Sequence, residues 1–221
     1  MTLRSLAPRV RLLAALVLLF AFSGCTNAYY SAMEQIGQHK RDILRSRIEA
    51  GQQDQQEAQE QIKSTYERFK EAADYDGGDF ERVYDTLNSE SEAAQDRADD
   101  VSERIESIEE VAADLFTEWQ EEIALYSSAS LKRSSEQSLR ETKQRYAKLI
   151  AAMKRAESKM PPVLNAFRDQ VLFMKHSLNA RAIAALEGTV GEIESDVASL
   201  IRDIDASIRE AESFLDQFEA S

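Results

Sequence analysis

The sequence predicts an all-α protein, an elongated antiparallel coiled coil or helical bundle of about four long helices. Between Thr26 and Met160 there is no proline, helix-forming residues dominate, and strand-like alternation is absent. Apolar residues recur at steps of four and three over long stretches, which is the spacing of heptad seams. The breaks between these stretches are few and short, and short turns between long helices make the helices antiparallel neighbours.

Residues 1–24 have the order of a secretory signal. Arg4, Arg9 and Arg11 make a basic start, and eleven apolar residues follow from Leu12 to Phe22. A helix of that length is too short to cross a bilayer, which takes about 20 residues. We therefore expect a targeting segment, and a cleaved signal peptide or a short amphipathic anchor is the plainer interpretation.

Cys25 favours a sharper interpretation, a bacterial lipoprotein. Phe22-Ser23-Gly24-Cys25 resembles the lipobox, in which the chain is cut before a diacylated cysteine, although Phe22 departs from the usual leucine. No second cysteine exists as a disulfide partner. Two or more acyl chains, such as palmitate, give stable anchoring. We expect residues 1–24 to be a lipoprotein signal and residues 25–28 a lipid-anchored N-terminus. Thr26 is not Asp, so by resemblance to sorted lipoproteins we favour the outer membrane over the inner, on the periplasmic face.

The composition is strongly acidic. The formal net charge is −13, and loss of the three leader arginines makes the mature chain more acidic still. Such a surface repels phosphate backbones and anionic lipids, so no nucleic-acid partner is expected. With this charge we do not expect a basic surface patch to hold the protein at a membrane, so the lipid on Cys25 would have to do so.

We expect residues 29–221 to form one helical domain, with helices at about 29–74, 80–125, 131–187 and 190–219. Tyr75 to Asp79 makes the first break, because two glycines permit left-handed backbone and Asp79 can cap the next helix. The serine-rich turn from Tyr126 to Ser130 makes the second. Gly188 and Thr189 make the third, with Thr189 and Glu192 as a capping box.

The second helix has the clearest heptad seam, sustained over more than five heptads: Phe80, Tyr84, Leu87, Ser91, Ala94, Ala98, Val101, Ile105, Ile108, Ala112, Leu115 and Trp119. In the third helix Pro161 and Pro162 interrupt the pattern, but the apolar phase continues beyond them. A helix kinked at Pro161-Pro162, and not a loop, fits that phase.

Two arrangements remain open for residues 49–98. Six glutamines in residues 51–61 and a seam of small residues suggest a thin hairpin arm, whose tip around Phe69, Phe80 and Tyr84 would carry an apolar cluster. Alternatively, the last helix covers this hairpin in an ordinary four-helix bundle.

Neither metal chemistry nor catalysis is indicated by a motif. His39 and His176 lack the Glu-x-x-His spacing of di-metal bundles and the spacing of zinc sites. The acidic turn with Asp74, Asp76, Asp79 and Glu81 fails the EF-hand pattern, and a solvated, capped turn is the simpler interpretation. No nucleophile elbow or phosphate loop occurs. We expect no catalytic residue, no metal and no cofactor.

Three segments resemble a family of Gram-negative lipoproteins known only as a domain of unknown function. They are YYSAMEQIGQHKRDIL from Tyr29, YDGGDF from Tyr75 and AFRDQVLFMKHSLNARAIAALEG from Ala166. The resemblance spans nearly the whole mature chain. It implies an exported, helical, lipid-anchored envelope protein, and it carries no activity, cofactor or functional residue onto this chain.

These observations predict a non-enzymatic structural or adaptor lipoprotein, anchored through Cys25 and reaching toward an envelope partner. If the bundle has an interaction surface, we expect it at Phe69, Phe80 and Tyr84, with the segment from Phe173 to Leu186 second. Ordinary core packing is the alternative for both, and it is slightly favoured. A regulator that binds an envelope hydrolase or synthase is the alternative, and an unrecognised hydrolase is the third candidate. Long heptads with charged flanks also make a homo-oligomer a candidate assembly.

Overall fold

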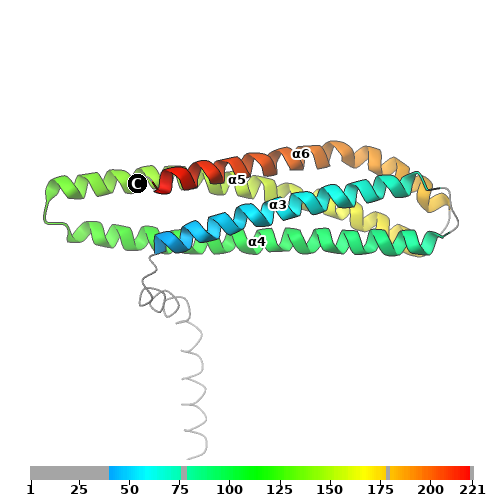
Figure 1. Ribbon diagram of the computed structural model, residues 1–221, viewed down its shortest axis with the longest axis horizontal. Helices are drawn as coiled ribbons and strands as arrows, with labels where there is room; N and C mark the ends of the chain where they lie inside the picture. The colour runs from blue at the N-terminus through cyan, green and yellow to red at the C-terminus, as the bar shows by residue number, and fades with distance from the viewer. Residues whose placement is uncertain (1–39, 76–78, 178–179, 220–221) are drawn as a thin grey trace, which may run out of the picture. The chain divides into compact units, whose positions relative to one another are not determined.

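The computed structural model describes residues 40–75, 79–177 and 180–219 (Figure 1). The chain divides into two units, residues 1–43 and 44–221, and the helical bundle belongs to the second unit. Four helices make up the described residues: α3 (Lys40–Ala73), α4 (Phe80–Leu125), α5 (Ala129–His176) and α6 (Ala180–Glu219). No strand occurs in these ranges, so the predicted all-α helical bundle is confirmed.

The four helices run up, down, up and down, each antiparallel to the next. Ion pairs and hydrogen bonds join each helix to the next, and α6 back to α3. In each pair of helices, residue numbers fall on one helix as they rise on the other. The contacts are Asp54–Arg104 and Gln61–Glu90, Glu109–Lys154 and Trp119–Ser135, Lys159–Asp203 and Gln170–Thr189, and Gln52–Ile208 and Gln59–Asp205. α3 and α5 therefore lie diagonally across the bundle, as do α4 and α6.

Side-chain caps begin two of the helices. Asp79 precedes α4, and its carboxylate accepts a hydrogen bond from the backbone N–H of Arg82 at 3.1 Å. Ser128 precedes α5, and its hydroxyl accepts from the backbone N–H of Leu131 at 3.5 Å. Each side chain satisfies one of the donors that a helix start leaves without a partner. The first two predicted breaks, and α4 over residues 80–125, are confirmed.

α5 is continuous through Pro161 and Pro162. Both prolines are exposed, whereas their neighbours Met160, Val163 and Leu164 are buried. A proline removes a backbone donor, and on the exposed side of a helix water can hydrate the carbonyl left without it. The predicted continuity is confirmed, and the predicted kink stays a prediction.

The third predicted break is wrong. α5 ends at His176, where the backbone N–H of Ser177 donates to the Met174 carbonyl at 3.0 Å, and α6 already runs through Gly188. The expected capping box does not form, because Thr189 lies inside α6. Its hydroxyl donates to the Ala185 carbonyl at 3.3 Å and accepts from Gln170 Nε2 of α5 at 2.6 Å. The predicted boundaries 131–187 and 190–219 are therefore corrected to 129–176 and 180–219.

The predicted hairpin arm is also wrong. α6 packs along the α3 half of this hairpin, through contacts of Gln52 with the Ile208 carbonyl, Gln55 with Ser207 and Tyr66 with the Val190 carbonyl. The alternative of an ordinary four-helix bundle is the observed one. The small seam residues Ala94 and Ala98 are buried in its core.

A different hairpin projects from the bundle. Tyr146 of α5 lies 6.5 Å, ring to ring, from Phe214 of α6, only five residues before α6 ends, whereas α5 starts seventeen residues before Tyr146. The start of α5 and the end of α4 therefore extend past the end of α6 by about twelve residues, or about 18 Å. Figure 1 shows this α4–α5 hairpin extending beyond the end of α6.

Candidate functional site

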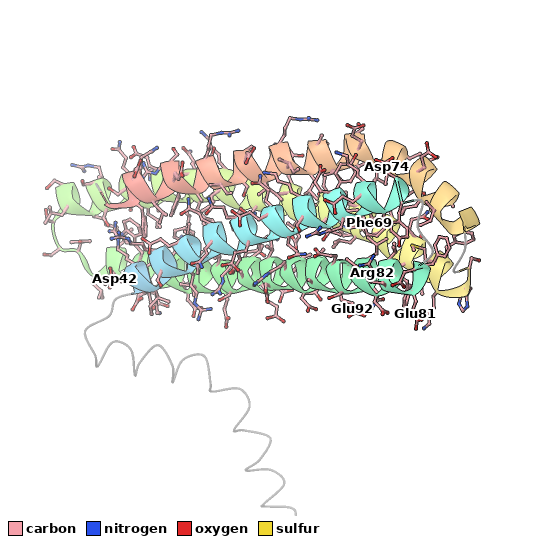
Figure 2. The ribbon with its side chains drawn as sticks, turned by 45° about the vertical axis from the view of Figure 1, so that its right-hand side comes forward. Asp42, Phe69, Asp74, Glu81, Arg82 and Glu92 are labelled. Atoms are coloured by element: carbon pink, nitrogen blue, oxygen red, sulfur yellow. The ribbon has the colours of Figure 1, made fainter. Side chains whose placement is uncertain are left out.

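Phe69, the centre of the predicted interaction cluster, is a core residue. Its side chain is fully buried, and its ring stacks on Phe167 of α5 with centroids 4.8 Å apart. Figure 2 labels Phe69 on the C-terminal half of α3, at the same end of the bundle as Asp74, Glu81 and Arg82. Because α6 covers this part of α3, Phe69 offers no surface to a partner, and its assignment as an interaction residue is wrong.

Phe80 and Tyr84 lie on the first turns of α4 and are half-buried. The Phe80 ring contacts the Tyr75 ring edge to face, with centroids 6.4 Å apart. Tyr75 therefore covers part of the Phe80 ring. Phe69 is fully buried, whereas Phe80 and Tyr84 are half-buried. The three predicted residues therefore do not form one exposed apolar cluster.

A shallow, polar-edged pocket of about 290 Å³ lies at this α3–α4 end. Its lining combines charged groups with small apolar ones: Arg68, Glu71, Ala72, Tyr75, Arg82, Val83, Thr86 and Leu87. The surrounding turn, residues 71–85, contains six acidic residues and one basic residue. We call residues 71–85 the acidic end of the bundle.

Phe173, the fourth predicted residue, is exposed on the last turn of α5. It is 39% exposed, and Leu172 beside it is 48% exposed. Among the predicted contact residues it is the one that the bundle leaves accessible. The rest of the predicted segment, to Leu186, lies partly outside the described residues.

The two most exposed large apolar residues of the described ranges were not among those predicted to contact a partner. They are Leu125, 84% exposed, and Leu131, 57% exposed, and both lie at the α4–α5 turn together with Tyr126, which is 45% exposed. We call residues 123–135 the hairpin tip. The serines predict a turn with helix caps and nothing more. The sequence nevertheless contains a signal of exposed apolar residues. Leu125 and Leu131 stand outside the heptad seam, next to a turn, where an apolar side chain has no helix to face.

The glutamine-rich stretch of α3 forms a buried polar layer against α6. The Ser207 hydroxyl donates to Gln55 Oε1 at 2.9 Å, and both side chains are fully buried. Gln59 Nε2 donates to Asp205 Oδ1 at 2.7 Å and to the Ile201 carbonyl at 3.3 Å. Gln55 Nε2 is buried with no hydrogen-bond partner among the described atoms. Buried polar groups of this kind fix the register of two helices, because a slipped register leaves them unsatisfied.

Tyr146 of α5 is a half-buried titratable residue with two aromatic neighbours. Tyr146 lies between Phe116 and Phe214, and burial, with the negative charge of Glu109 second, raises the pKa of its phenol well above the ordinary value. No base or nucleophile accompanies it in these contacts. The arrangement is that of a packed aromatic, and it keeps the phenol neutral.

The candidate chemical residues are dispersed. His176 is exposed at the end of α5, and Asp79 serves as the cap of α4. His39, Asp76 and Cys25, with the predicted signal 1–24 and segment 25–28, lie outside the described residues. Within the described ranges, no group of three or more His, Cys, Asp or Glu side chains could hold a metal ion. None of the helices described is long and apolar enough to cross a bilayer.

Comparison with known proteins identifies a family for this chain. Neither the curated proteins nor the solved structures contain a significant match to this chain. A family model, described as a protein of unknown function (DUF2959), matches residues 29–218. That range includes all four helices of the bundle almost to the end of α6. The chain therefore belongs to the DUF2959 family of proteins of unknown function.

Proposed function

We propose that this chain is a non-enzymatic lipoprotein of a bacterial cell envelope, in which the helical bundle acts as a structural or adaptor element. Cys25 carries the lipid, on the periplasmic face and in the outer membrane. The bundle is the part that reaches a partner. An envelope protein, or a second copy of the chain, is the partner that this role requires.

The observation that carries the proposal is the length and interlocking of the helices. α4 has 46 residues and α5 has 48, so each is about 70 Å long. Inter-helix polar contacts recur along them, from Gln61–Glu90 near one end to Trp119–Ser135 near the other. A bundle tied together along its length resists bending, which suits a spacer or a platform.

The sequence before the bundle supports the anchor. A basic start, an apolar stretch and small residues precede the chain's one cysteine. The strongly acidic composition disfavours whole-surface attraction to anionic lipid, so that a covalent lipid is the simplest attachment.

Crosslinking in living cells tests the proposal. Cells expressing the wild-type chain and cells expressing Cys25→Ala are treated with a membrane-permeant crosslinker, and captured proteins are identified by mass spectrometry. We expect a discrete envelope protein captured only by the wild-type chain. Capture of the chain itself alone would favour a self-assembling spacer, and the adaptor role would then be dropped.

A regulator of an envelope hydrolase or synthase is the second candidate. Exposed Leu172 and Phe173 favour it, since a contact with an enzyme needs an accessible apolar anchor. Under this alternative the captured protein is an enzyme, and its rate with purified substrate changes when the chain is added. Phe173→Ser, at an exposed position, removes that change without loss of helicity.

A further inference from the structure

We propose that the hairpin tip, residues 123–135, inserts into the headgroup region of the phospholipid bilayer in which Cys25 is anchored. The inference rests on the proposed lipid anchor. It specifies in addition which end of the bundle contacts the membrane and which side chains enter it.

Exposed apolar side chains are concentrated at the tip. Among the described residues, five large apolar side chains are exposed, and three of them, Leu125, Tyr126 and Leu131, lie within seven residues of sequence. The tip also stands clear of α6, since the α4–α5 hairpin extends past the end of that helix (Figure 1). Apolar side chains at the end of a projection can enter a bilayer without unpacking the bundle.

The charge and residue types of the tip match a phospholipid surface. Residues 123–135 contain Lys132 and Arg133 and no acidic residue, whereas Glu121 and Glu122 of α4 and Glu136 of α5 lie just behind them, farther from the end of the hairpin. Basic side chains near a bilayer surface are attracted to lipid phosphates, and a tyrosine ring is well suited to the headgroup level. The acidic end, residues 71–85, has the opposite character. The two ends of the bundle thus differ in the surface they favour.

A second copy of the chain fits the tip less well. A stable interface between proteins buries roughly 800 Å² on each partner. Three exposed side chains on a turn offer only part of that area. Entry into a bilayer needs no matching surface, and a small apolar contribution is enough when a lipid anchor already holds the chain at the membrane.

The length of chain between Cys25 and the bundle allows both to reach one bilayer. Arg47 of α3 hydrogen-bonds Ser107 of α4, and Leu125 lies eighteen residues, or about 27 Å, farther along α4 toward the tip. α3 begins at Lys40, about 10 Å closer to the tip than Arg47, which leaves about 17 Å to the level of Leu125. Fifteen residues separate Cys25 from Lys40, a contour length of up to about 50 Å, so the chain is long enough for the anchor to lie at the level of the tip.

A tryptophan reporter tests the inference in the full chain. Trp119→Phe provides a background, in which Tyr126→Trp reports on the tip and Phe80→Trp, the matched control, reports on the acidic end. The proteins are purified from envelopes, and their masses show whether lipid is attached. They are then reconstituted into vesicles of phosphatidylethanolamine and phosphatidylglycerol with or without spin-labelled phospholipid.

We expect spin-labelled lipid to quench the Tyr126→Trp reporter and to leave the Phe80→Trp reporter unchanged. Leu125→Asp with Leu131→Asp should shift the equilibrium of the tip away from the bilayer by about tenfold or more. Absence of quenching at the tip, or equal quenching at both ends, would overturn the inference. So would a shift of the tip reporter that depends on protein concentration without vesicles, because that result assigns the tip to a second copy.

The proposed function and this inference fail separately. If the purified chain carries no lipid, the proposed anchor is lost. The same chain is then coupled through its single thiol, Cys25, to a maleimide-bearing phospholipid in the vesicles, and quenching of the Tyr126→Trp reporter still decides whether the tip enters the bilayer. Circular dichroism of every variant checks that the helices are intact.

Discussion

Phe69 of α3 stacks on Phe167 of α5, with ring centroids 4.8 Å apart and ring planes inclined by 30°. α3 and α5 are diagonal in the bundle, so this contact crosses its core. Both rings are fully buried. The pair joins α3 to α5 at the end of the bundle where the sequence left a free arm open as one arrangement.

Phe69→Ala should therefore destabilise the fold. Truncating a buried phenylalanine removes apolar burial and leaves a cavity, and we expect the free energy of unfolding to fall by about 3–5 kcal/mol. Chemical denaturation followed by circular dichroism measures it. The matched control, Phe173→Ala, alters an exposed ring and should cost less than about 1 kcal/mol. Equal costs for the two variants would contradict the diagonal packing.

Gln55 and Ser207 should show strong coupling. Ser207→Ala removes the donor to a buried Gln55 oxygen, and an unsatisfied buried polar group costs about 1–3 kcal/mol. In Gln55→Leu with Ser207→Ala the polar pair is gone, so the double variant should be no less stable than Ser207→Ala alone. A double-mutant cycle in urea measures the coupling. Additive losses would show that the two side chains do not depend on one another.

Gly188→Ala should stabilise the protein. Gly188 lies inside α6, and nothing stands within 4 Å of the position that a Cβ would take. Alanine in an exposed helix interior is favoured over glycine by about 0.5–1 kcal/mol. The melting temperature should rise in thermal denaturation.

Gly51→Leu provides the contrast. Gly51 is buried, and a Cβ there would lie 3.0 Å from both Ile108 Cδ1 and Met153 Cε, so a large side chain has no room. This variant should be less stable than the wild type by about 1–3 kcal/mol.

If Gly188→Ala instead lowered the melting temperature, Gly188 would be the helix terminator that the sequence suggested, and the corrected helix boundary would be wrong.

Tyr146 should make stability fall at high pH. Burial, with the charge of Glu109 second, raises the pKa of its phenol, so the folded protein holds this proton more tightly than the unfolded chain does. The stabilisation is therefore complete below the unfolded pKa, about 10, and is lost as the pH rises above it. Tyr146→Phe should reduce the slope of unfolding free energy against pH in that range. Tyr126→Phe, at an exposed tyrosine, serves as the matched control, and an identical slope in all three proteins would contradict the assignment.

Much of the fold could be predicted because local signals agree with it. α4 was predicted over its observed residues, since a long heptad seam lies between Asp79, which caps the helix, and the serine-rich turn. The prolines in α5 did not mislead, because the apolar phase continues from Met160 into Leu164.

The errors arose where tertiary contacts override local signals. Gly188 and Thr189 have the sequence of a helix end, but Gln170 of α5 donates to the Thr189 hydroxyl within a continuous helix. Glutamines 55 and 59 suggested exposure, yet their amides satisfy groups on α6. A single helix does not reveal such partners, so the sequence could not decide between the arm and the ordinary bundle, and the tip cluster that depended on the arm does not form. The exposed Leu125 and Leu131 were overlooked because heptad seams indicate core positions and give no information on residues beside the turns.

The central claim is that Cys25 anchors this bundle to an envelope membrane, and the intact mass of the mature chain tests it most directly. The protein is extracted from bacterial membranes with detergent and its mass is measured. We predict a chain that begins at Cys25 and carries the added mass of a diacylglyceryl group and a further acyl chain. A chain of unmodified mass, or a Cys25→Ala variant that stays in the membrane fraction to the same extent, would contradict the claim.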